Sequence, residues 1–139
     1  METTELKNFP FDTLTSRGGS ISKDGDWYSI EIPLDGFEAD GHVVETSIRL
    51  DGIDFGVEHF EELGGRIFAF PVNPDDGYID GSMYFLGAHN PVDVVAIRFG
   101  PIVGKAVTAT FTMRFLFEAE GTGYQDADLV YTTNLHAEP

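Results

Sequence analysis

Residues 105–118 alternate between apolar and polar side chains, and this pattern constrains the fold more than any other feature of the chain. The apolar side chains fall on one face of the segment. The opposite face carries threonines and charged residues, with Leu116 as the one exception. A period of two is typical of a strand that is buried on one side. The segment is therefore predicted to be a long strand that twists or bends along its length. The apolar positions are Val107, Ala109, Phe111, Met113, Phe115 and Phe117.

Other segments of the chain indicate more strands of the same kind. Asp-Gly pairs such as Asp24-Gly25 and Asp51-Gly52 lie between them and favour the positive φ of tight turns. Only residues 57–63 have a helical pattern, and it covers one or two turns. The predicted strands are residues 27–34, 43–50, 66–72, 78–86, 92–99 and 129–135, and a further short strand at 53–57 is left open. We therefore expect an all-β fold, an antiparallel β-sandwich or small barrel of about seven to eight strands, with at most one short helix near 57–63.

The length of 139 residues favours a single domain. We expect residues 1–20 to form a loosely structured N-terminal arm, held down by Phe9 and Phe11, and residues 21–139 to form one all-β domain. The first residues are too polar for a signal peptide, and no run is apolar enough to span a bilayer. A cytoplasmic protein is the simplest expectation.

The charge excludes several classes of partner. The chain has 24 acidic and 8 basic residues, which gives a formal net charge of −16. Such a surface repels phosphate backbones and anionic lipid, so neither nucleic acid nor a membrane is an expected partner. Because there is no cysteine, the chain has no disulfide, no thiolate metal site and no cysteine nucleophile.

No motif in the sequence predicts catalysis or a bound cofactor. The four histidines are far apart in the sequence, and no serine lies in a Gly-x-Ser-x-Gly elbow. Ser82 follows Asp80-Gly81 and is interpreted as a turn residue. The acids of residues 73–80 could serve calcium, but they lack the spacing of a helix–loop–helix site and are explained by turns. The expectation is a protein that is not an enzyme and has no metal and no cofactor.

One short fragment resembles a known family. Gly25-Asp26-Trp27, at the start of a predicted strand, is similar to the Gly-x-Trp signature of lipocalins and related calycin barrels. The resemblance implies that Trp27 closes the base of a barrel and that Arg114, on a late strand, packs across it. It also implies the alternative function, a calycin-like barrel that binds a small apolar ligand. In that case an apolar pocket would be lined by Phe, Tyr and Met side chains.

The acidic residues are concentrated in the first half of the chain. Residues 24–62 contain twelve acids and a single base, Arg49. This clustering favours a binding surface over a general adaptation of the whole surface to salt or solubility, which would spread the charge. The candidate binding residues are Asp35, Glu38, Asp40, Asp51, Asp54, Glu58, Glu61 and Glu62.

The preferred function is therefore a non-enzymatic acidic protein-interaction module that docks a basic protein partner. In its sharpest form it is a cytoplasmic protein that binds and neutralises a basic toxin or nuclease, as immunity proteins and inhibitors do. A homo-oligomer is left open.

Overall fold

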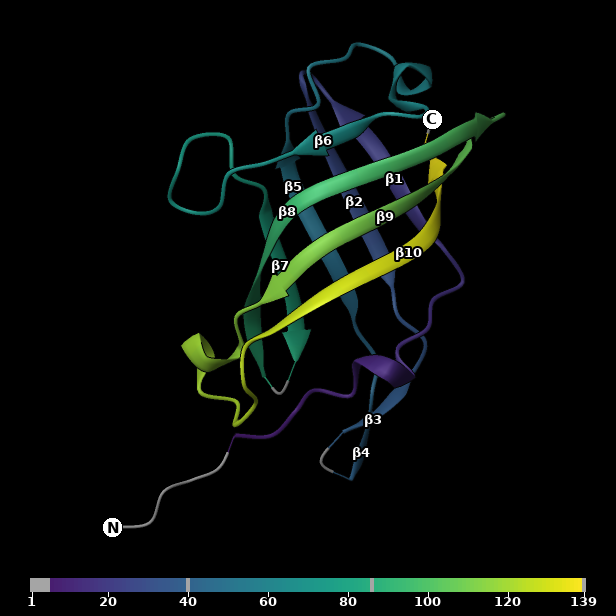
Figure 1. Ribbon diagram of the computed structural model, residues 1–139. Coiled ribbons are helices and arrows are strands. Elements are labelled where there is room, and N and C mark those ends of the chain that lie inside the picture. The colour runs from purple at the N-terminus through teal and green to yellow at the C-terminus, as the bar shows by residue number, and fades with distance from the viewer. Residues whose placement is uncertain (1–5, 40, 86, 139) are drawn as a thin grey trace.

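The computed structural model describes residues 6–39, 41–85 and 87–138, which form ten strands and three short 3-10 turns (Figure 1). The strands are β1 (Gly19–Asp24), β2 (Trp27–Pro33), β3 (Phe37–Ala39), β4 (His42–Val44), β5 (Ser47–Ile53), β6 (Ile67–Ala69), β7 (Asp80–Phe85), β8 (Ala88–Val103), β9 (Ala106–Phe115) and β10 (Ala127–Ala137). The 3-10 turns are η1 (Phe11–Thr13), η2 (Phe60–Leu63) and η3 (Phe117–Glu120). The prediction of an all-β fold is confirmed. The described part of the chain contains two short 3-10 turns, η1 and η3, in addition to η2, which lies in the segment near 57–63.

Seven strands close into a barrel. The sheet has the order β6-β8-β7-β5-β2-β1-β10-β9, and β8 also pairs with β9, so that the sheet closes on itself. The 16-residue strand β8 makes this closure. Its first part pairs with β7, its second part pairs with β6 on the same side, and its other side pairs with β9. Of the two architectures that the sequence left open, the structure is the barrel.

Two pairings differ from a simple antiparallel meander. β1 and β10 are parallel, with Gly19 beside Leu135, whereas the other strand pairs of the barrel are antiparallel. The strand predicted at 43–50 is broken into β4 and β5, because residues 45 and 46 belong to no strand. β3 and β4 then form a separate two-stranded hairpin, which the alternation did not indicate.

The barrel interior is filled by the apolar side chains that alternate along the strands. All six apolar positions predicted to face inward between residues 107 and 117 are at most 2% exposed. Phe111 is fully buried, and its neighbours in the sheet are Ile97 on β8 and Tyr131 on β10. The prediction that this strand is buried on one side is confirmed.

Aromatic rings gather at both ends of this interior. One cluster lies near η2, where Phe55 contacts four other rings. The second lies at the opposite end, near η1 and η3, where Phe9 contacts five rings. The first cluster consists of Tyr28, Phe55, Phe68, Phe70 and Phe99. The second consists of Phe9, Phe11, Phe37, Phe85, Phe115, Phe117 and Tyr124.

The segment before β1 lies against the barrel end near η3. Phe9 is 5% exposed and Leu14 is 6% exposed, so both belong to the core. The backbone N–H of Lys7 donates to the carbonyl of Gly123, and the N–H of Gln125 donates to the carbonyl of Lys7. These bonds hold the segment in place while the Phe9 ring fills the barrel end.

Truncation of Phe111 tests the core. Because its ring is fully buried between β8 and β10, Phe111→Ala should lower the free energy of unfolding by about 3–5 kcal/mol. Val130→Ala removes an apolar side chain that is 65% exposed, and it should cost less than about 0.5 kcal/mol. Chemical denaturation measures both values, and equal values would show that the β9 assignment is wrong.

Phe9 tests whether the segment before β1 contributes to stability. Phe9→Ala should cost about 3–5 kcal/mol, since it leaves a cavity among five rings. The control, Leu6→Ala, truncates a side chain that is 44% exposed and should have little effect. If Phe9→Ala unfolded at the same denaturant concentration as wild type, this segment would not be part of the cooperative unit.

Candidate acidic binding site

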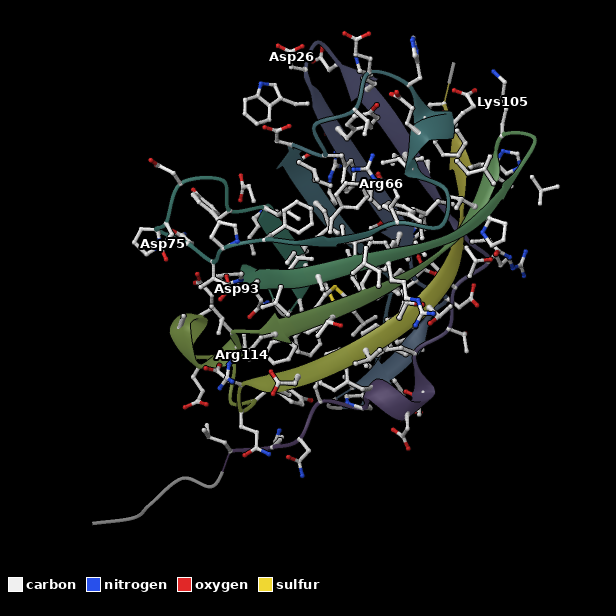
Figure 2. All side chains as sticks on the ribbon, turned by 45° about the horizontal axis from the view of Figure 1, so that its top comes forward. Asp26, Arg66, Asp75, Asp93, Lys105 and Arg114 are labelled. Carbon is white, nitrogen blue, oxygen red and sulfur yellow. The ribbon has the colours of Figure 1, made fainter. Side chains whose placement is uncertain are left out.

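Three connections bring acidic side chains to one end of the barrel, which we call the η2 end. They are the β1–β2 turn, the residues that follow β5, and η2 itself (top of Figure 1). Two basic residues lie next to these connections, Lys23 in β1 and Arg66 between η2 and β6. Figure 2 turns this end forward and shows Asp26 at the tip of the β1–β2 turn, with Arg66 and Lys105 well apart from it. The acids of the connections are Asp26, Asp54, Glu58, Glu61 and Glu62, and the adjoining strands add Asp24 in β1 and Asp51 in β5.

The eight candidate binding residues do not all lie at this end. Five of them do, namely Asp51, Asp54, Glu58, Glu61 and Glu62. Asp35 and Glu38 lie at the opposite end, in and beside β3, and Asp40 lies outside the described residues. Asp35 is also engaged locally, because it accepts a hydrogen bond of 2.8 Å from Thr15 and lies 3.8 Å from Arg17. The single acidic surface expected from the sequence is thus divided between two ends.

Glu62 organises the connection that carries the η2 acids. Its carboxylate accepts hydrogen bonds of 2.9 Å from the backbone N–H groups of Glu58 and His59. Donation from the His59 N–H is the main reason that the pKa of Glu62 lies below its ordinary value. Glu58 and Glu61 make no side-chain hydrogen bond or ion pair within the described ranges. Glu62 therefore shapes the loop, while its two neighbours are available to a partner.

The acids at this end affect the pKa of the Tyr28 phenol. Tyr28 is 2% exposed, and its hydroxyl donates a hydrogen bond of 3.3 Å to the carbonyl of Val57. Burial is the larger cause that raises the pKa of Tyr28, and the charges of Glu62 and Glu61 raise it further. The η2 acids therefore lie close enough to the barrel end to act on a group inside it.

Two carboxylates face each other on the adjoining strands. Asp51 on β5 is paired directly with Asp80 on β7, and both are exposed. Like charges that are directly opposite in a sheet destabilise it by a few tenths to about 1 kcal/mol. The pair therefore extends the acidic surface from the η2 end down the outer face of the barrel.

Trp27 lies at the η2 end, directly opposite Asp24 across the β1–β2 turn. It opens β2, it is the only tryptophan in the chain, and it is 52% exposed. The resemblance to the lipocalin signature implied that Trp27 closes the barrel base under Arg114. That implication is wrong, because the indole is largely in water and Arg114 lies 3.6 Å from Asp128 on the neighbouring strand. The sequence reasoning thus missed Trp27 as a surface feature, although Tyr28 facing inward places its neighbour outward.

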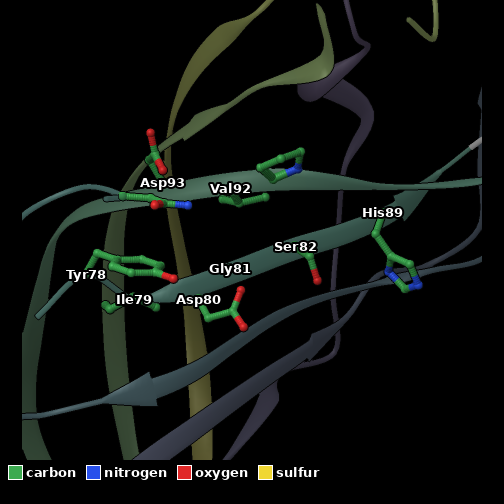
Figure 3. A pocket seen from close by; sticks show the side chains of 10 residues that line it. Tyr78, Ile79, Asp80, Gly81, Ser82, His89, Val92 and Asp93 are labelled. Carbon is green, nitrogen blue, oxygen red and sulfur yellow. The ribbon is translucent and has the colours of Figure 1, made fainter. Parts of the chain in front are cut away.

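A shallow groove of about 230 Å³ runs along the outer face of β7 and β8 (Figure 3). Asp80, Ser82 and His89 line it, together with Tyr78 and Asp93. Ser82 lies within β7, so its interpretation as a turn residue is wrong. In the described part of the chain no hydrogen bond joins it to His89 or to an acid, and the His89 ring packs against Tyr84 instead. Nothing in the groove therefore has the geometry of an activated nucleophile.

Burial raises the pKa of Asp93 in this groove, and the opposing charge of Arg114 partly offsets that rise.

Among residues 6–39, 41–85 and 87–138, no group of three or more histidine or acidic side chains is arranged to hold a metal ion. Those same residues contain no helix with the length and apolar character needed to cross a membrane.

Comparison of the chain with protein-family models, with curated proteins and with solved structures gave no match.

The pKa of Tyr28 tests the position of the η2 acids. Alkaline titration of phenolate absorbance, taken as the difference between wild type and Tyr28→Phe, should give a pKa above the ordinary 10.0. Glu61→Gln should lower that pKa because it removes a repelling charge. Glu120→Gln, at the opposite end, should leave it unchanged.

The same shift predicts how stability depends on pH. A pKa that is higher in the folded than in the unfolded state gives stability that is lost as pH rises. Wild type should therefore lose stability relative to Tyr28→Phe as pH increases above 10.0. Parallel stability curves for the two proteins in that range would contradict the shift.

Proposed function

We propose that this protein is a non-enzymatic interaction module that docks a basic protein partner on the η2 end of its barrel. The observation that carries the proposal is that seven acids, five from the connections and two from β1 and β5, lie at the barrel end that also carries an exposed tryptophan. Acidic surfaces accelerate association with basic partners and set their orientation. An exposed tryptophan is the side chain most typical of interface hot spots.

Within this proposal, the protein acts in the cytoplasm, and in the sharpest form it neutralises a basic toxin or nuclease by covering its active face. The alternative, a barrel that binds a small apolar ligand, has less support. Within each cluster the aromatic rings pack against one another inside the barrel. They lie where such a ligand would have to bind.

A pair of charge reversals tests the docking end. Glu58→Lys with Glu61→Lys changes the net charge from −16 to −12 and leaves the Glu62 hydrogen bonds in place. We expect association with a partner recovered by affinity purification to slow by on the order of tenfold, with a weaker dependence on salt. Stopped-flow association rates at low and high salt measure both effects.

The matched control is Glu38→Lys with Glu120→Lys, which makes the same change of charge at the opposite end. It should change the association rate less than about twofold. If both pairs slowed association equally, the acidity would act as a general property of the surface. If only the control pair slowed it, the partner would dock at the β3–β4 end.

A further inference from the structure

A tight turn fixes the backbone position of Trp27, whose side chain is 52% exposed. β1 and β2 are joined by the two residues Gly25 and Asp26, and Gly25 has the positive φ of 62° that such a short turn needs. The turn pairs Asp24 directly with Trp27. Side chains that are directly opposite in an antiparallel pair have Cβ atoms roughly 4.5–5.5 Å apart. The Asp24 carboxylate therefore lies beside the indole.

One further acid, Asp54, follows the strand on the other side of Trp27. Tyr28 pairs with Ile53 at the end of β5, and the residue that follows Ile53 is Asp54. Trp27 is thus placed between a strand that ends in Asp24 and a strand that leads into Asp54. The Oδ1 atom of Asp54 accepts a hydrogen bond of 2.9 Å from Gly56 N–H, which fixes this carboxylate and leaves its second oxygen for a ligand.

No cation of the chain is found on this arrangement. Within the described ranges, no lysine or arginine lies over the indole or forms an ion pair with Asp24, Asp26 or Asp54. Arg66 is 5.0 Å from the centre of the Phe68 ring instead. The electron-rich face of a neutral indole, with carboxylates on either side, is the chemistry that recognises a cation.

We propose that Trp27 is the anchor for one arginine side chain of the basic partner, with its guanidinium stacked on the indole and its N–H groups directed to Asp24 and Asp54. This inference rests on the proposed function and names the group that the η2 end recognises. A guanidinium is planar and weakly hydrated, so it stacks on an indole while its in-plane donors reach flanking carboxylates. An ammonium is compact and strongly hydrated, and it has no flat face to stack.

Two peptides of equal charge test the proposal, one with alternating arginine and glycine and one with lysine at the same positions. Fluorescence anisotropy of the labelled peptides gives dissociation constants for wild type, Trp27→Phe and Trp27→Ala. We expect wild type to bind the arginine peptide up to about fivefold more tightly than the lysine peptide, because only the guanidinium stacks flat on the indole while it reaches the carboxylates. Trp27→Phe should retain part of that preference, and Trp27→Ala should abolish it.

Wild-type tryptophan emission is a direct reporter, because Trp27 is the only tryptophan in the chain. It should change when the arginine peptide binds. Asp24→Asn with Asp54→Asn should weaken arginine-peptide binding more than Glu38→Gln with Glu120→Gln, which removes the same charge at the opposite end.

The outcomes separate this inference from the proposed function. Equal affinity for the two peptides, or a preference that survives in Trp27→Ala, would overturn the arginine anchor. If binding in those cases still weakened with salt and with the Glu58 and Glu61 reversals, the docking end itself would stand. Failure of both peptides to bind wild type at low salt would overturn the proposed function and the anchor together.

Discussion

The two-sided pairing of β8 is the interaction on which the rest of the structure depends. One side of β8 pairs with β7 and β6 and the other with β9, which joins the two ends of the sheet. The approach of β7 is very close at Gly81, where an added Cβ atom would lie 2.3 Å from the carbonyl oxygen of Val92. Closure gives each of the seven barrel strands a partner on both sides, although β1 pairs with only residues 135–137 of β10, and it fixes which side chains face inward.

The directions of the strands decide at which end of the barrel the acidic residues lie. Neighbouring antiparallel strands run in opposite directions, so the connections along the first half of the chain fall at alternate ends of the barrel. The β1–β2 turn and the residues after β5 reach the η2 end, while the segment between β2 and β5, with Asp35 and Glu38, reaches the other. A run of acids that is continuous in sequence is therefore separated in space.

Alternation was enough to predict the fold class and the buried face of residues 107–117, because a period of two is a local property of a strand. It could not predict the parallel pairing of β1 with β10 or the β3–β4 hairpin, since pairing depends on residues far apart in the chain. For the candidate site, charge along the sequence indicated five acids that do meet at the η2 end. Exposure of Trp27 followed from the inward position of Tyr28, but the resemblance to a buried signature tryptophan pointed the other way.

The parallel pairing of β1 with β10 has a consequence for how the protein is made. Gly19 and Leu135 are neighbours in the barrel but are separated by most of the chain. During synthesis on the ribosome, β1 cannot pair with β10 until β10 has left the exit tunnel. Until then β1 and β9 each expose an unpaired edge, and closing so long a loop is slow. Until β10 has emerged, the nascent chain is therefore open to pairing with other chains.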